Sequence, residues 1–304
     1  MFEATTPRSL TDDASGSSDS RPALVLTRCD SALQRADGVG RLTMLGSQRG
    51  IQIVDLFQRS PIRIMLPEVA PGAIAEVVFV NTGGGIAGGD RLESSVTALD
   101  GASITVTTQA AERVYGALSR SARAVTKLKV CETGKLAWLP QETILYNRAR
   151  LTRETEIELA SGAELLALEW LVLGRAAHGE KVDGGQITDS WRVRKDGRLI
   201  WADSFRAWDA TFRHLQVKAL LSNCKAFGTL IFFGPEMQAR LEFLREITSS
   251  LHCHCAATSV GGLIVVRLAS EFALDLKLAL RGLLENFGRE LGPGPFGVPK
   301  MWSC

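Results

Sequence analysis

A long succession of short β-type segments constrains the fold of this chain more than any other feature. From residue 23 to about residue 205, short runs of alternating or β-branched residues are separated by Gly, Pro and Asp-Gly, which is typical of many short strands. Within residues 151–159 the odd positions are mostly apolar, as at Leu151 and Leu159, although they include Arg153. The even positions are polar. One face of this strand is therefore predicted to be buried and the other to be exposed to solvent.

Turn and helix signals complete the pattern. Asp196-Gly197 separates two such runs and predicts a hairpin, and Asp100-Gly101 is given a similar role between two earlier runs. Beyond residue 230 the apolar period changes to three and four, which predicts helices over 235–250 and 272–291 with a strand over 262–268 between them. We therefore expect a mainly β protein with two α-helices near its C-terminus.

Composition excludes several classes of protein. Hydrophobic residues make up 45% of the chain, which is enough for a core. The 35 Lys and Arg nearly balance the 33 Asp and Glu, which argues against a polybasic nucleic-acid binder. No apolar run reaches the ~18 residues of a membrane span. Residues 1–22 are polar and are predicted to be a disordered tail, followed by a single domain over 23–304. The six scattered cysteines contain no CxxC, which favours a cytoplasmic protein.

A glycine-rich stretch at residues 81–90 formally contains GxGxxG. A dinucleotide site needs a helix after the third glycine, yet residues 90–99 continue as a Thr/Ser/Val-rich strand. We therefore expect a tight β–β connection, in which positive φ angles make Gly88 and Gly89 hard to replace. The structural loop is assigned to Gly83, Gly84, Gly85, Gly88 and Gly89.

Two further clusters are open to a functional and a structural interpretation. His252-Cys253-His254-Cys255 consists of metal-ligand residue types, but strand alternation places the imidazoles and the thiols on opposite faces, which favours a half-buried strand. A basic run is interpreted as a solvated strand face, with a partner surface as the alternative. It comprises Arg113, Arg120, Arg123, Lys127 and Lys129.

Four blocks in fixed order together resemble the urease accessory protein UreD family, also called UreH. The blocks are NTGGGIAGGDRL (81–92), TTQAAERVYGA (107–117), LAWLPQETILYNRARL (136–151) and EWLVLGRAAHGE (169–180), trailed by the RKDGRLIWAD hairpin (194–203). The chain departs from the family in its polar N-terminal tail, in Glu112, where the family often has Thr, and in its last residues, 294–304.

This resemblance implies a β-helix-like stack of strands and a non-enzymatic role. A member of the family binds the urease apoprotein with UreF, recruits the GTPase UreG and helps to insert nickel, which crosses the UreD-like subunit in a water-filled passage. Ni²⁺ would then be in transit, with no permanently bound cofactor and no nucleic-acid or membrane partner.

The matched blocks also suggest which residues such a passage uses, because scattered carboxylates hold Ni²⁺ only transiently. The predicted nickel path comprises Asp90, Glu142 and Glu180, with Thr108, Gln109 and Gln141 as channel-lining residues. The competing interpretation is structural: an Asp after Gly-Gly often caps a turn, and a buried Glu often pairs with an Arg, here Arg148 or Arg175.

A partner interface is predicted at Leu283 and Phe287, because residues 272–291 carry more apolar positions than one helical stripe needs. Two other functions stay open. One is an enzyme that binds a nucleotide or sugar phosphate at the glycine loop, which requires a helix after Gly88. The other is a β-rich interaction protein unrelated to metals, whose loss would leave urease activity unchanged.

Overall fold

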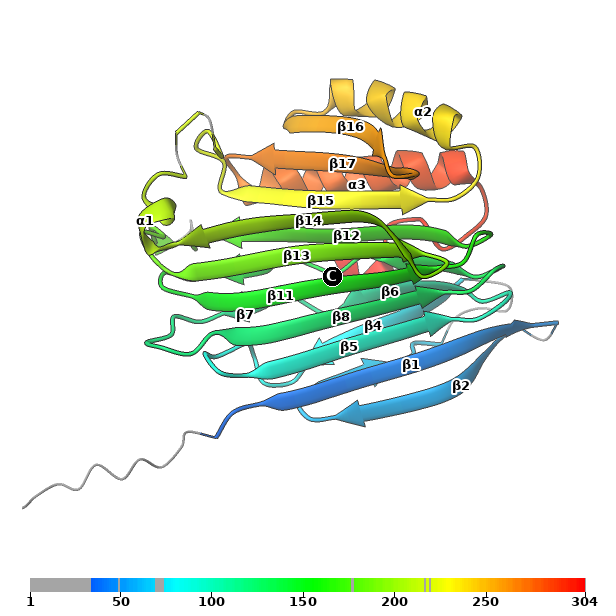
Figure 1. Ribbon diagram of the computed structural model, residues 1–304, viewed down its shortest axis with the longest axis horizontal. Coiled ribbons are helices and arrows are strands. Elements are labelled where there is room, and N and C mark those ends of the chain that lie inside the picture. Colours follow the sequence, from blue (N-terminus) through cyan, green and yellow to red (C-terminus); the bar gives the residue numbers. More distant parts are fainter. Residues whose placement is uncertain are drawn as a thin grey trace, which may run out of the picture. The chain divides into compact units, whose positions relative to one another are not determined.

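Strands of the described chain alternate between two sheets that lie face to face (Figure 1). The computed structural model describes residues 34–48, 50–68, 74–175, 178–215, 217–218 and 220–303. The predicted tail, residues 1–22, lies outside this range. From Arg35 onward the chain forms one compact unit.

Seven of the described strands form the first sheet. In spatial order they are β14 (Arg198–Trp208), β13 (Gln186–Lys195), β11 (Arg150–Leu159), β8 (Ala122–Val130), β5 (Arg91–Ala98), β1 (Asp37–Ser47) and β2 (Gly50–Arg59). The second sheet runs β16 (His254–Val260), β17 (Leu263–Ser270), β15 (Ala226–Phe233), β12 (Glu164–Leu173), β9 (Lys135–Trp138), β6 (Ser103–Thr108), β4 (Ala75–Asn81) and β3 (Ile62–Met65). Off this path, β10 (Thr143–Leu145) pairs with β12, and β7 (Glu112–Val114) pairs with β10.

The middle of each sheet is parallel, because the chain winds as a solenoid. Successive strand pairs β4 and β5, β6 and β8, β9 and β11, and β12 and β13 each place one strand in either sheet, which makes four turns. This confirms the expected β-helix-like stack. Antiparallel strands close both sheets on either side of the solenoid.

Turn chemistry was predicted correctly at one Asp-Gly pair and wrongly at the other. Asp196 and Gly197 both have positive φ and join β13 to the antiparallel strand β14, which confirms the hairpin. Asp100-Gly101 joins β5 to β6, and these strands belong to different sheets. It is therefore a corner of the solenoid.

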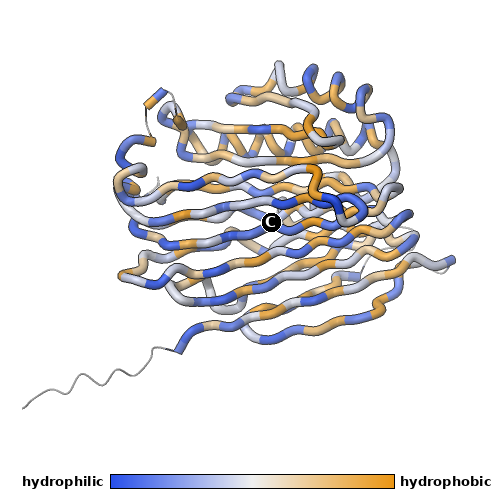
Figure 2. The backbone as a smooth tube through the Cα atoms, viewed as in Figure 1, coloured by the Kyte–Doolittle hydropathy of each residue, from blue (hydrophilic) through white to orange (hydrophobic). Residues whose placement is uncertain are grey.

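The expected helices are present and cover one face of the second sheet. They are α2 (Met237–Ser250) and α3 (Ala273–Leu291), with β16 and β17 between them in sequence. Their buried apolar residues share a core with the outer face of the second sheet, whereas a separate core fills the space between the sheets. Figure 2 shows hydrophilic and hydrophobic residues alternating along the strands, as expected for sheets with one buried face.

The described residues also include α1 (Asp209–Phe212), which follows β14, and a 3₁₀ turn, η2 (Lys300–Ser303), neither of which was predicted. Trp302 in this turn is buried and donates its indole N–H to the carbonyl oxygen of Leu139 at 3.1 Å. The chain's last described residues are thereby held against the second sheet. No helix in the described part of the chain has the length and apolarity that crossing a membrane requires.

Candidate functional site

The glycine-rich loop connects β4 to β5 without a helix. Ile86 forms an isolated bridge with Val114, and β5 begins at Arg91. The predicted β–β connection is confirmed, and the loop lacks the helix N-terminus that a dinucleotide phosphate requires.

Two different constraints require glycine in this loop. Gly84, Gly85 and Gly89 have positive φ, whereas Gly83 and Gly88 do not, so the predicted reason was wrong for Gly88. There a Cβ atom would lie 2.4 Å from Cβ of Ala117 and 2.6 Å from the carbonyl oxygen of Arg120. Close approach of the 117–120 segment therefore excludes a side chain at this position.

We expect Gly88→Val to lower the free energy of unfolding by about 1–3 kcal/mol through overpacking, and Gly89→Val to lower it by roughly 1–2 kcal/mol through its positive φ. Gly282→Ala on α3 is the control, because nothing lies within 4 Å of the position that a Cβ atom would take there and alanine favours a helix. Urea unfolding measures all three. Unchanged stability of Gly88→Val would contradict the close approach.

The three carboxylates predicted for a nickel path occupy separate places, each with a local role. The Asp90 carboxylate accepts the backbone N–H of Ala87 at 2.7 Å and of Ala36 at 2.9 Å, so it caps the glycine loop. Glu180 forms an ion pair with Arg175 at 2.9 Å. Its hydrogen bond from Arg175 holds the pKa of Glu180 below its usual range.

Glu142 lies next to β10, and one of its carboxylate oxygens is 3.7 Å from Nζ of Lys277. None of the three predicted carboxylates lines either of the two cavities described below. Their nickel role stays a prediction, and the structural interpretation accounts for the contacts of Asp90 and Glu180.

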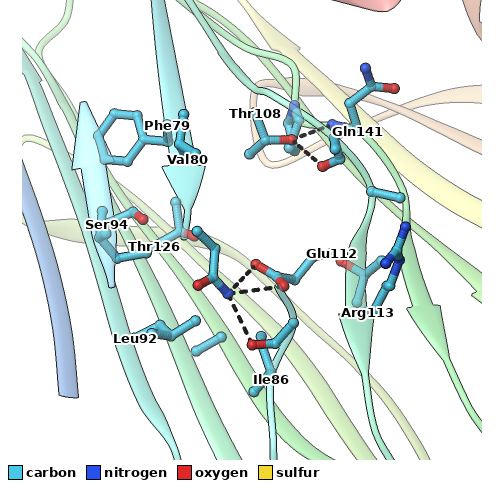
Figure 3. A pocket seen from close by; sticks show the side chains of 18 of the residues that line it. Phe79, Val80, Ile86, Leu92, Ser94, Thr108, Glu112, Arg113, Thr126 and Gln141 are labelled. Carbon is cyan, nitrogen blue, oxygen red and sulfur yellow. Dashed lines mark hydrogen bonds between the residues drawn. The ribbon is translucent and has the colours of Figure 1, made fainter. Parts of the chain in front are cut away.

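The predicted channel-lining residues do line a cavity. Thr108, Gln109 and Gln141 belong to the wall of a space of about 300 Å³ between the sheets, here called the first cavity. Thr108 accepts the backbone N–H of Gln141 at 2.9 Å. Figure 3 shows Thr108, Gln141 and Glu112 facing Phe79, Ser94 and Leu92 across this space.

Glu112 supplies a carboxyl group to the first cavity. Asn81 donates its side-chain amide to both carboxyl oxygens of Glu112 at 3.1 Å, and no ion pair of Glu112 occurs among the described residues. Burial raises the pKa of Glu112 to about 7, against the opposing effect of the Asn81 hydrogen bond. Glu112 therefore changes its charge near neutral pH.

We expect Glu112→Gln to stabilise the protein increasingly as the pH rises from 5 to 8, by on the order of 1–3 kcal/mol. The folded pKa lies above the unfolded one, so the contribution of neutral Glu112 is complete at low pH and is lost as the pH rises through about 7. Glutamine stays neutral throughout. Urea unfolding at both pH values measures the difference, and a constant difference would contradict the buried carboxyl.

Arg153, Glu169 and Asp189 form a buried charge cluster, and Arg153 and Glu169 also line the first cavity. Arg153 is 4% exposed, and its guanidinium donates to both oxygens of Asp189 at 2.9 and 2.7 Å and to Glu169 at 2.8 Å. Trp138 donates its indole N–H to the other Glu169 oxygen at 2.9 Å. The three charges thus meet between the sheets, fully hydrogen-bonded.

Burial and charge act in opposite directions in this charge cluster. Burial disfavours the charged guanidinium, but Asp189 and Glu169 outweigh it and raise the pKa of Arg153. Burial raises the pKa of Glu169, and Arg153 opposes that rise. Sequence analysis did not assign these residues to a site, although Arg153 at a buried odd position of its strand was a usable signal.

A second cavity, of about 480 Å³, lies on the other side of the charge cluster. Arg153 and Glu169 line both cavities. The second cavity is also lined by Asp203, which forms an ion pair with Arg267 at 2.8 Å, and by Cys255. Polar groups from both sheets therefore line each of the two cavities.

The His-Cys cluster follows the predicted alternation. His252 and His254 are exposed, whereas Cys253 and Cys255 are half-buried. No group of three or more His, Cys, Asp or Glu side chains suited to a metal ion occurs in the described part of the chain. The half-buried strand is thus confirmed for β16, which begins at His254.

The basic run is also an exposed strand face over part of its length. Arg123 pairs with Glu154 at 2.9 Å, and Lys127 pairs with Glu93 at 3.0 Å. These cross-strand pairs lie on the solvent side of the first sheet, as the structural interpretation predicted.

The predicted partner interface was wrong about which residues of α3 are accessible. Leu283 and Phe287 are 0% exposed and pack against the second sheet. The apolar side chains that α3 exposes are instead Leu274, at 65%, and Leu278, at 58%. The apolar stripe of α3 is wide because the second sheet covers it, so its width does not indicate a partner surface.

Comparison with known proteins gives one consistent result. The family model described as UreD urease accessory protein matches residues 36–303. A urease accessory protein UreD 1 from Brucella ovis is 37% identical over 274 residues, which cover 90% of this chain and 95% of that protein. A urease accessory protein UreD from Rhizobium leguminosarum bv. viciae is 37% identical over 270 residues, or 89% of this chain and 96% of that protein.

Proposed function

Since the chain belongs to the UreD family of urease accessory proteins, which gives it a role in urease maturation, we propose that it acts there as a non-catalytic scaffold that passes Ni²⁺ to the urease apoprotein. UreF and UreG are its proposed partners. The alternative function, an enzyme that binds a nucleotide or sugar phosphate at the glycine loop, loses its main support, because this loop leads into β5 and not into a helix.

The observation that carries the nickel proposal is the pair of cavities that share Arg153 and Glu169. Amide, hydroxyl and carboxyl oxygens line the two cavities, among them those of Thr108 and Gln141 in the first and of Asp203 in the second. Such ligands bind a divalent cation weakly and release it, as passage requires. Arg153 neutralises part of the carboxylate charge, which keeps the cation from being held at this point.

Blocking the first cavity tests this path. We expect Ser94→Phe to reduce nickel-dependent urease activation at least tenfold, because Ser94 lines the cavity and a phenyl ring would occupy the passage. The matched control is Ser95→Phe, since the adjacent residue on the same strand points to the opposite, outer face. Both variants are assayed after co-purification with urease and UreF has shown that the complex assembles.

Full activation by an assembled Ser94→Phe complex would remove the first cavity from the nickel path. Loss of activation in both variants would indicate a general effect on β5 and would also count against the path. Urease activity that is unchanged when this protein is deleted would contradict the maturation role itself.

We place the docking surface for UreF on the outward side of α3. Leu274 and Leu278 are one helical turn apart and form an exposed apolar pair, next to exposed Phe272. Apolar groups in such a cluster commonly mark a protein interface. This surface replaces the one predicted at Leu283 and Phe287.

A further inference from the structure

Two thiols lie on the same side of the chain at the start of β16. Cys253 and Cys255 occupy alternate positions and both are half-buried, so their side chains project from one face of this segment. Both are partly accessible, and neither is in a disulfide. A pair of neighbouring, reachable thiols is the starting geometry for reversible oxidation.

We propose that Cys253 and Cys255 are a redox-sensitive pair that closes to a disulfide in the presence of a disulfide oxidant such as oxidised glutathione. This property goes beyond the role in urease maturation and does not depend on it.

The chemistry assigns each sulfur a part. The hydrogen bond from Cys255 lowers the pKa of Cys253, and the same bond together with burial raises the pKa of Cys255. The Cys253 thiolate is therefore the nucleophile. It attacks one sulfur of oxidised glutathione, breaks the S–S bond and releases one glutathione thiolate.

The second step closes the pair. Cys255 gives up its proton, and its thiolate attacks Sγ of Cys253 in the mixed disulfide, which releases the second glutathione. The two protein thiols lose two electrons and two protons, and these convert oxidised glutathione to two molecules of the reduced form. Cys224 is a poor competitor, because it is buried and burial raises its pKa.

Strand geometry predicts that this disulfide is easily reduced. Residues two apart on an extended strand have Cα atoms ~6.6–6.8 Å apart, which is the upper limit for a disulfide. Cys253 precedes the first residue of β16, so the bend there can shorten the distance. A bond at the limit of the allowed geometry is strained, and strained disulfides are the labile, regulatory ones.

A metal site is the weaker interpretation of this pair. The exposed His252 and His254 lie on the other face, and the described residues offer no third ligand.

The test is differential alkylation of the full-length protein. After incubation in glutathione buffers of increasing oxidised fraction, free thiols are blocked with N-ethylmaleimide at acid pH and the protein is digested with trypsin. Residues 246–267 form one tryptic peptide that contains both cysteines and excludes Cys224. We expect this peptide to lose both maleimide groups together as the oxidised fraction rises, and dithiothreitol to restore them.

Two variants distinguish the pair from ordinary thiol oxidation. Cys255→Ser should stop at the mixed disulfide, with one glutathione on Cys253, whereas Cys131→Ser should close the pair as the wild type does. The proposal is overturned if both thiols stay alkylated in the most oxidising buffer, if each carries its own glutathione, or if either cysteine pairs with another cysteine of the chain.

Discussion

Replacing Arg153 by methionine should lower the free energy of unfolding by about 3–5 kcal/mol, because it leaves Glu169 and Asp189 buried without a cation. Both carboxylates are less than 10% exposed, and Arg153 is the cation that both of them contact. Urea unfolding at neutral pH measures the loss. The deficit should shrink at acid pH, where the orphaned carboxyl group of Glu169, whose pKa burial raises, takes up a proton.

Arg123→Met is the matched control for this prediction. Arg123 also bridges two strands of the first sheet, where it pairs with Glu154, but its side chain is 56% exposed. Its removal should cost at most about 1 kcal/mol. Equal losses in the two variants would contradict a desolvated charge cluster, as would an Arg153→Met deficit that does not change with pH.

The charge cluster also shows how far the sequence predicts this fold. Alternation within residues 151–159 correctly placed Arg153 on the buried face of β11, because side-chain direction in a strand follows from position alone. Alternation does not identify the partner strand. Glu169 and Asp189 meet Arg153 because β12 faces β11 from the other sheet and β13 pairs with β11 in parallel register.

The same distinction explains the corner at Asp100-Gly101. A two-residue turn signal was interpreted as a hairpin, but a solenoid sends consecutive strands to different sheets, so local turn chemistry alone does not determine what the turn connects. Asp196-Gly197 lies where the solenoid ends and the strands become antiparallel. There the local signal and the topology agree.

For the candidate site residues, too, sequence position alone did not determine which groups each side chain contacts. Thr108, Gln109 and Gln141 lie in the matched sequence blocks and belong to a cavity wall, while their role in a nickel channel stays a prediction. Asp90 and Glu180 lie in equally distinctive blocks, yet backbone N–H groups and Arg175 occupy their carboxylates. A distinctive block thus identifies residues that the fold needs, and only the contacts separate those that hold a loop from those that face a cavity.

We expect Phe287→Asp to abolish cooperative folding. Phe287 is 0% exposed and contacts Phe232 of the second sheet edge to face, with ring centroids 5.1 Å apart. Loss of a buried Phe alone costs about 3–5 kcal/mol, and burying an unpaired carboxylate adds several more. Their sum reaches the roughly 5–15 kcal/mol that an ordinary domain has in total. Circular dichroism during heating should show no unfolding transition.

The outward face of the same helix should respond in the opposite way. Replacing both Leu274 and Leu278 by Asp changes side chains that are more than half exposed, so we expect a shift in melting temperature of only a few degrees together with loss of UreF co-purification. Two sides of one helix then separate stability from partner binding. A folded Leu274→Asp/Leu278→Asp variant that still co-purifies with UreF would move the docking surface away from α3, whereas a folded Phe287→Asp variant would contradict the packing of α3 on the second sheet.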